Sequence, residues 1–556
     1  MVTILKKNTR NIATKKVLVK KGSIQTKALG NAKKPLILRA KTSSDSKSFS
    51  TKNLGVSTGS IRIAVLHSEI AHKFSYRPGD RLKIVSGRRS TVAILDISDS
   101  QVQKNQIGLF AEVQSDLNIS TKTQVTLESY PKPDAVFLIQ KKLHGATLTK
   151  QEFITILDAI IKHELTDIEM TYFVSACYHH ELTNAEIADL TQAMIETGNP
   201  IDFSKLYPKR PIVDKHCIGG VAANRTTALV VPILAAAGYI VPKTSSRSIT
   251  SPAGTSDTIE YLANVSLTRK KIKDVVHKTN CCMVWGGALD LAPSDDYLIK
   301  VEHPISLDPV GQMIASILAK KKSVGSTHVL IDIPVGAGAK VKSRFKALSL
   351  KKKFIEVGKL LGIHVIVVLT DGTEPIGNGI GPMLEARDIL WTLSNHSNQS
   401  MQLREKAIAM SAHLFSQLED ISHAQAIKRA TQILDSNQAY GIFTQMLKSQ
   451  GLRVTSLDPE DFKLAQLTFT YVASKSGKIT HIDNAQISRL AKIAGAPFDQ
   501  DAGIYLHKHV SDIVKKGDIL YTVYTNDSAK LRRIKEICKT PTIEGCGINI
   551  LGTTKS

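Results

Sequence analysis

Short apolar segments alternate with longer helical ones between residues 210 and 455, and this alternation constrains the fold more strongly than any other feature. The apolar segments are residues 212–214, 240–243, 328–333 and 365–369. Strands that alternate with helices form a mostly parallel sheet, and ligands bind such sheets at the carboxyl ends of the strands. We therefore predict an α/β domain over residues 209–455, with its functional groups in the segments that follow the strands.

Three capping-box patterns precede this domain. In each, a Thr stands three residues before a Glu: Thr149 and Glu152, Thr166 and Glu169, Thr183 and Glu186. The Thr side chain can accept a hydrogen bond from a first-turn amide, and the Glu can reach back to the amide of the capping residue. Apolar residues at helical spacing follow each pattern. The sequence therefore predicts a helical domain over residues 133–208, which helices from about 268–325 are expected to join.

The two ends of the chain have a different pattern. Residues 56–132 and 465–530 contain short alternating segments separated by turns, which are typical of β-strands. We expect a small N-terminal β domain, a C-terminal α+β domain and a tail over residues 531–556. The predicted fold class is thus a multidomain α/β protein, built on a helical domain and a mostly parallel α/β domain.

The positive charge of the chain is concentrated at its start. The formal net charge is +24, and residues 1–55 hold fourteen Lys or Arg against the single acid Asp45. This segment is rich in Lys, Ser and Thr and only weakly periodic, so we expect a disordered tail, with a transit peptide as the alternative. A basic nucleic-acid-binding protein is an alternative function of another class. However, aromatic residues make up only 5% of the chain and no nucleic-acid-binding motif occurs.

Several other classes of protein are disfavoured. No apolar run is long enough to cross a bilayer, and none of the six cysteines lies in a CxxC pair or in a cluster with zinc-ligand spacing. We therefore expect a cytoplasmic protein with free thiols, no bound metal and no membrane partner.

The first candidate site follows the segment 212–214. Lys215 and His216 would lie at the carboxyl end of a strand, and Gly219 and Gly220 would let the backbone turn closely around a ligand. The helix that follows begins with free amides, which suit an anion. An ordinary tight turn between a strand and a helix is the alternative interpretation of the two glycines.

A hydroxyl-rich segment follows residues 240–243. Residues 245–255 contain six Ser or Thr side chains and Arg247. Hydroxyl groups, backbone amides and a guanidinium together suit phosphate oxygens. A surface loop is the alternative.

A third group lies on a predicted helix. Ser316 and Lys320 are four residues apart and share one helix face, and Asp308 precedes that helix. A Lys and a Ser on one face can bind the polar edge of a base, although a solvated helix in this Lys-rich stretch is the alternative. Lys340, after a glycine-rich turn, and the glycine-rich segment 371–382 are further candidates.

The motifs occur in the order found in a known family. The segment from Lys215 to Gly220 and the Ser-x-Arg…Gly-Thr-x-Asp-x-x-Glu pattern from Ser245 to Glu260 resemble the signature of the thymidine/pyrimidine-nucleoside phosphorylases. The resemblance runs from about residue 135 to 525. Segments 246–255, 306–309 and 375–382 are closer to the branch that contains AMP phosphorylases and bacterial proteins classed as thymidine phosphorylases. Members of that branch carry an extra N-terminal module.

The resemblance implies a set of site residues. The implied phosphate site comprises Lys215, Gly220, Thr226, Ser245, Ser246, Arg247, Ser248, Ile249, Thr250, Ser251 and Thr255. The implied base or substrate site comprises Lys300, Ser316, Lys320 and Lys340, and the implied catalytic residues are Asp308, His216 and Lys320. Two positions depart from the family: Cys217 stands where Ser is usual, and Lys300 stands near an Arg of the nucleoside-specific members.

The resemblance also implies a reaction. Phosphate would attack the anomeric carbon of thymidine and release thymine and 2-deoxyribose 1-phosphate, without a cofactor. Phosphorolysis of a nucleoside 5′-monophosphate, as in AMP phosphorylases, is the alternative. A reaction like that of anthranilate phosphoribosyltransferase, on a related fold, is a third possibility, but it would need Mg²⁺ and carboxylate ligands. A homodimer or larger homo-oligomer is expected.

Overall fold

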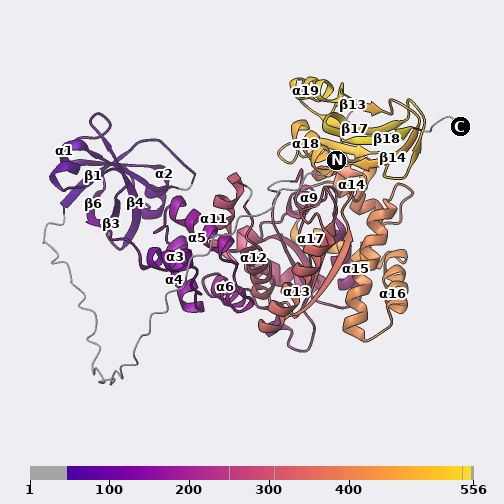
Figure 1. Ribbon diagram of the computed structural model, residues 1–556, viewed down its shortest axis with the longest axis horizontal. Helices are drawn as coiled ribbons and strands as arrows, with labels where there is room; N and C mark the ends of the chain where they lie inside the picture. The colour runs from indigo at the N-terminus through magenta and orange to yellow at the C-terminus, as the bar shows by residue number, and fades with distance from the viewer. Residues whose placement is uncertain (1–46, 60, 249–250, 306, 541–542, 553–556) are drawn as a thin grey trace, which may run out of the picture.

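The computed structural model describes residues 47–552, except residues 60, 249–250, 306 and 541–542. Figure 1 shows an elongated molecule in which an N-terminal barrel, a helical region, an α/β region and a C-terminal β region follow one another. Among the described residues, no helix is both long enough and apolar enough to span a bilayer.

The N-terminal module is a closed six-stranded barrel. Its strands are β1 (Lys47–Asn53), β2 (Ile63–His67), β3 (Arg81–Ser86), β4 (Arg89–Ser98), β5 (Gln106–Leu109) and β6 (Gln124–Ser129), in the order β1-β5-β2-β4-β3-β6. Helices α1 (Ser68–Lys73) and α2 (Ala111–Leu117) cover it.

The predicted boundary at residue 55 is wrong, because β1 belongs to the barrel. This strand pairs with β5 and β6, and its Phe49 is buried in the barrel core. The rest of the predicted tail, residues 1–46, lies outside the described residues.

The helical domain forms as the capping boxes predict. Its helices are α3 (Asp134–Leu143), α4 (Lys150–Ile161), α5 (Asp167–His179) and α6 (Asn184–Glu196), followed by the short α7 (Phe203–Leu206). All three capping boxes are present at the starts of α4, α5 and α6. Helices α11 (Pro293–Glu302) and α12 (Val310–Ser323) pack against this group, as expected.

Helix α10 (Arg269–Thr279) does not join the helical domain, although it falls in the range 268–325 that was expected to do so. It packs on α17 and β9 because its apolar face, with Ile272, Val275 and Val276, is part of the α/β core.

The α/β domain contains two sets of parallel strands. Strands β7 (Val213–Cys217), β10 (His328–Val335) and β11 (His364–Asp371) form a sheet in the order β11-β10-β7, and β8 (Val241–Ser245) pairs with β9 (Cys281–Trp285). A parallel bridge between Ile212 and Ile240 links the two sets. The predicted parallel α/β domain is therefore confirmed.

Helices surround these strands. They are α8 (Thr226–Ala236), α9 (Thr255–Leu262), α13 (Arg344–Leu360), α14 (Pro382–Leu393), α15 (Met401–Glu419), α16 (His423–Asp435) and α17 (Gln438–Gln450), with 3₁₀ turns at Gly286–Leu289, His303–Ile305 and Pro459–Asp461. Helix α8 is apolar on all sides and buried, which fixes the position of the turn that precedes it.

The C-terminal domain extends to residue 552. It contains β13 (Leu467–Val472), β14 (Gly477–Ile482), β15 (Gly503–Leu506), β16 (Ile513–Val514), β17 (Ile519–Thr525) and β18 (Ile548–Gly552), with β12 (Gly379–Ile380) added from the α/β domain. Its helices are α18 (Asn484–Ala494), α19 (Ser528–Cys538) and α20 (Ile543–Cys546).

The predicted C-terminal tail over residues 531–556 is wrong as far as residue 552. Strand β18 pairs with β14, and Ile534, Ile548 and Ile550 are buried in the core of the domain. Residues 553–556 lie outside the described residues.

Candidate active site

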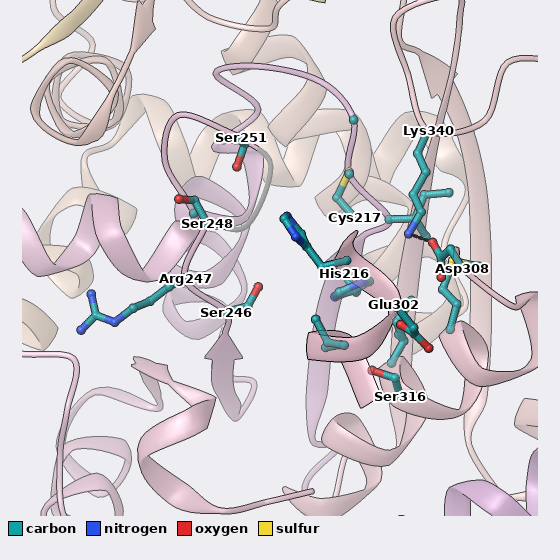
Figure 2. Close-up of a pocket in the computed structure, with 18 of the residues that line it drawn as sticks. His216, Cys217, Ser246, Arg247, Ser248, Ser251, Glu302, Asp308, Ser316 and Lys340 are labelled. Atoms are coloured by element: carbon teal, nitrogen blue, oxygen red, sulfur yellow. Dashed lines mark ion pairs between the residues drawn. The ribbon is translucent and has the colours of Figure 1, made fainter. Parts of the chain in front are cut away.

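A large cavity lies at the carboxyl ends of β7, β8 and β9, and Figure 2 shows its interior. Its volume is about 2100 Å³, which exceeds the range of roughly 300–1,000 Å³ typical of a single small-ligand pocket. Helices α11 and α12 contribute a second wall, and α18 and α19 of the C-terminal domain contribute a third. The cavity can therefore hold two reactants side by side.

The turn after β7 is closely packed against the loop after β10. Gly219 and Gly220 have φ angles of +93° and +91°, in the left-handed region that favours glycine. A Cβ on Gly220 would lie 2.2 Å from the backbone nitrogen of Lys340. Any larger residue would therefore displace the loop that carries Lys340.

His216 lies on the cavity wall just before this turn. Burial, reinforced by the charges of Lys321, Lys243, Lys215 and Lys320, holds the pKa of His216 well below its usual value. The imidazole is thus neutral at pH 7 and can act as a hydrogen-bond donor or acceptor, but it holds no extra proton to give to a leaving base.

Cys217 stands beside His216 on the same wall. Its Sγ lies 3.3 Å from Asn224 Nδ2, which donates to it, and burial raises the pKa of the thiol. The cavity therefore meets a neutral thiol at this position.

The hydroxyl-rich loop after β8 is held from behind by Asp257. Its Oδ2 accepts hydrogen bonds from the backbone amides of Ser248 and Gly254, each at 2.7 Å. Arg247 forms ion pairs with Glu260 and Asp257, and its guanidinium lies 4.7 Å from the centre of the Trp285 ring. In Figure 2 the Arg247 side chain points away from His216. Arg247 thus braces the loop.

The structure places most, but not all, of the predicted phosphate residues on the cavity wall. Gly220, Ser245, Ser246, Arg247, Ser248, Ser251 and Thr255 line the cavity. Lys215 and Thr226 are fully buried and do not line it. Lys215 Nζ lies 3.3 Å from Asp332 Oδ2, and Thr226 Oγ1 donates to Asn224 Oδ1 at 2.6 Å. Ile249 and Thr250 lie outside the described residues.

Of the predicted base-site residues, Ser316 and Lys320 lie on the wall formed by α11 and α12, and Lys340 lines the cavity beside Asp308. Ser316 and Lys320, on one face of α12, both contact Asp295 Oδ2 of α11, at 2.8 and 2.6 Å. Asp308 and Lys340 also line the cavity and form an ion pair, drawn as a dashed line in Figure 2. Lys300 does not line the cavity, and its Nζ lies 3.1 Å from Asp167 Oδ2 on α5.

Several polar residues on this wall were not among the predicted ones, and Asp295, Glu302 and Gln312 are among them. Glu302 ends α11 and lines the cavity, and burial, with smaller effects from Asp308 and Asp295, raises its pKa to about 8. Gln312 is only 3% exposed and also lines the cavity. Gln312 could have been found from its spacing, four residues before Ser316. Nothing in the sequence marks Glu302, whose properties depend on tertiary burial.

The third wall is positively charged. Arg489 and Lys492 of α18 and Lys530 and Arg533 of α19 line the cavity. None of these four cations, here called the cationic wall, forms an ion pair with a carboxylate among the described residues, although Lys530 interacts electrostatically with Asp527, which caps the same helix. Partial burial lowers the pKa of Lys492.

Across the part of the chain that the structure describes, no group of three or more His, Cys, Asp or Glu side chains is arranged to hold a metal ion.

Three family models match the chain domain by domain. The helical bundle domain of a glycosyl transferase family matches residues 137–198, and the α/β domain of the same family matches residues 209–440. The C-terminal domain of pyrimidine nucleoside phosphorylases matches residues 478–543.

Proteins of similar sequence carry two names. A "Putative thymidine phosphorylase" of Legionella pneumophila (strain Paris) is 40% identical over 484 residues, which cover 86% of this chain and 92% of the relative. An AMP phosphorylase of Pyrococcus furiosus is 43% identical over 480 residues, which cover 86% and 94%.

A solved anthranilate phosphoribosyltransferase from Thermus thermophilus is more distant. Its sequence identity is 16% and its TM-score is 0.48, with 56% of this chain and 99% of that chain covered. The three family models and the relatives of both names indicate the same enzyme family. The chain belongs to the family of thymidine/pyrimidine-nucleoside phosphorylases and AMP phosphorylases, and it is a pentosyltransferase.

Proposed function

We propose that this enzyme uses inorganic phosphate to cleave a nucleoside 5′-monophosphate into its base and ribose 1,5-bisphosphate. The observation that carries the proposal is the cationic wall, whose four side chains face the cavity and form no ion pair with a carboxylate among the described residues. Cations in this position attract and orient a phosphate dianion. A neutral nucleoside carries no group of this charge.

The other two walls suit the remaining parts of the reaction. The glycine turn and the hydroxyls of Ser246, Ser248 and Ser251 offer donors to the attacking phosphate. Ser316 and Lys320, held by Asp295, lie on the wall where the base would bind. An oxygen of phosphate would form a bond to C1′ as the bond from C1′ to the base nitrogen breaks, and the bonding electron pair would leave with the base.

The departing base must gain a proton or a hydrogen bond. Asp308 is engaged in an ion pair with Lys340. Glu302, with its pKa of about 8, holds a proton at neutral pH and lies on the same wall. We assign proton donation to Glu302, and we assign to His216, which is neutral, a hydrogen bond to the base.

Thymidine is the second candidate substrate, because relatives at about 40% identity carry that name. A nucleic-acid-binding role, the alternative considered from charge, does not fit membership of an enzyme family.

The test compares phosphate-dependent base release from AMP, CMP, thymidine and uridine. We expect kcat/KM for a nucleoside monophosphate to exceed that for the nucleosides. In the double variant Arg489→Ala/Arg533→Ala, KM for the nucleotide should rise about tenfold, since charge-assisted contacts to phosphate are lost, while nucleoside turnover should not change.

Arg532→Ala is the matched control, since Arg532 neighbours Arg533 on α19 but does not line the cavity. A preference for thymidine that the double variant leaves untouched would contradict the proposal.

A further inference from the structure

Gln312 has an unusual position on the base-side wall. It lies on α12 with Ser316 and Lys320, and the spacing of four residues places all three on one helix face. All three line the cavity. Ser316 and Lys320 both direct their polar groups to Asp295. Gln312 is therefore the member of this row whose polar group remains available.

The carboxamide of Gln312 is buried and, in the part of the chain that the structure describes, unpaired. The side chain is 3% exposed. Neither its Nε2 nor its Oε1 has a hydrogen-bond partner among the described residues. Burying a donor and an acceptor without partners destabilises a folded protein. A carboxamide in this state at the edge of a cavity indicates a ligand that completes its hydrogen bonds.

The chemistry of the group defines that ligand. A carboxamide presents one donor and one acceptor side by side, in a plane. Nucleobases that carry an exocyclic amino or carbonyl group beside a ring nitrogen present the complementary pair, and amide side chains bind adenine through two hydrogen bonds in this way. Phosphate and ribose offer no such planar pair.

We propose that Gln312 is a specificity-determining residue that recognises the nucleobase through paired hydrogen bonds from its carboxamide to the exocyclic group and the adjacent ring nitrogen. The proposal rests on the proposed function for the presence of a nucleobase in the cavity. It adds the part of the base that is recognised and the residue that recognises it.

The burial of Gln312 explains why we expect it to select strongly between nucleobases. Because the side chain is almost fully buried, an unsuitable base would leave both polar atoms unpaired. Sites of this kind reject analogues that lack the hydrogen-bonding group much more strongly than apolar pockets reject a missing methylene.

The test removes the carboxamide and the exocyclic group in turn. Gln312→Met keeps a similar volume and removes both polar atoms. For the wild type, kcat/KM for AMP should exceed that for purine riboside 5′-monophosphate, which lacks the amino group, by at least about tenfold, or ~1.4 kcal/mol. In Gln312→Met the two values should become equal. If the wild type prefers CMP, zebularine 5′-monophosphate is the corresponding analogue.

A stability measurement separates this role from a structural one. The unliganded Gln312→Met protein should unfold at the same temperature as the wild type or higher, because unpaired polar atoms have been removed. Ser411→Ala is the matched control. Ser411 is fully buried, its Oγ is also unpaired among the described residues, and it does not line the cavity. The control should leave base selectivity unchanged.

Binding of free bases distinguishes failure of this proposal from failure of the proposed function. In calorimetry with phosphate present, the wild type should bind the base it prefers, adenine or cytosine, more tightly than the analogue of that base that lacks the amino group, and Gln312→Met should bind the two equally. If this holds while no nucleotide is cleaved, the proposed function is wrong and the role of Gln312 stands. If the variant keeps the wild-type discrimination, or if the wild type shows none, the role of Gln312 is overturned.

Discussion

Lys215 Nζ lies 3.3 Å from Asp332 Oδ2, and both side chains are completely buried. Lys406 Nζ also lies 3.1 Å from this oxygen, and Thr370 donates to the other one at 2.6 Å. These cations, with Thr370, hold the pKa of Asp332 at about 2 despite its burial. The network ties β7 to β10 directly below the glycine turn, so Lys215 supports the floor of the site.

Replacement of Lys215 should therefore affect stability. In Lys215→Met, Asp332 keeps Lys406 as its one ionic partner among the described residues, and we expect the free energy of unfolding to fall by about 3 kcal/mol, since breaking a buried pair leaves an incompletely compensated charge. Urea unfolding measures this change. The control is Lys300→Met, which removes a pair that is 42% and 43% exposed and should cost less than about 1 kcal/mol. Equal effects of the two variants would contradict a supporting role.

Asp257 should control the affinity for phosphate without touching it. Its carboxylate holds the amides of Ser248 and Gly254 and pairs with Arg247. Asp257→Asn weakens these charge-assisted contacts, so we expect KM for phosphate to rise about tenfold while KM for the nucleotide changes little. Asp274→Asn, at an exposed position on α10, is the control. If KM for the nucleotide changed and KM for phosphate did not, the loop after β8 would serve the nucleotide and not the phosphate.

Glu302 should make stability depend on pH. Its folded-state pKa of about 8 exceeds the ordinary value of 4.5, so the folded protein retains a proton that the unfolded chain releases as the pH rises between these values. The contribution of Glu302 to stability therefore falls as the pH rises from about 4.5 and levels off above about 8. Glu302→Gln removes this dependence. The free energy of unfolding of the variant in urea, minus that of the wild type, should therefore be larger at pH 8.5 than at pH 5.

The same variant tests the assigned proton donor. In the wild type, kcat should decline above about pH 8 as Glu302 loses its proton. Glu302→Gln should have a low kcat without this decline, and substrates whose bases leave readily as anions should be affected least. A variant with the wild-type pH profile would show that another group donates the proton.

Cys217 places a thiol on the cavity wall beside His216, and its reactivity and replacement can be tested. Because burial raises its pKa, the thiol should react with iodoacetamide at pH 7.5 more slowly than free cysteine does. Cys217→Ser supplies a stronger hydrogen-bond donor to the same wall, so KM for phosphate should fall, as measured by initial rates. An increase in KM for phosphate would show that this wall binds phosphate better with the sulfur of Cys217 than with a hydroxyl group.

Local sequence patterns predict the elements of this fold well. The three capping boxes give the starts of α4, α5 and α6 because each depends on residues only three positions apart. The alternation between residues 210 and 455 likewise gives β7, β8, β10 and β11, but not β9, which lies in the range 268–325 where helices were expected. Residues 47–53 were missed because β1 is defined by its pairing with β5 and β6, distant in sequence. Strand β18 was missed for the same reason.

For the candidate site, the sequence predicts the loops but not the orientation of their side chains. Motif spacing identifies the loops that line the cavity, but it does not give the direction in which a side chain points. Lys215 and His216 are adjacent, yet alternation along β7 buries the first and presents the second to the cavity. The burial of Glu302 and the position of the cationic wall on the cavity depend on tertiary contacts, which leave no local pattern.

The most direct test of the account is the dependence of base release on phosphate concentration, with AMP or CMP as substrate. We expect no release without phosphate, a saturable rise as phosphate is added, and one molecule of ribose 1,5-bisphosphate for each molecule of base. Base release at the same rate without phosphate, or with free ribose 5-phosphate as the product, would contradict the account.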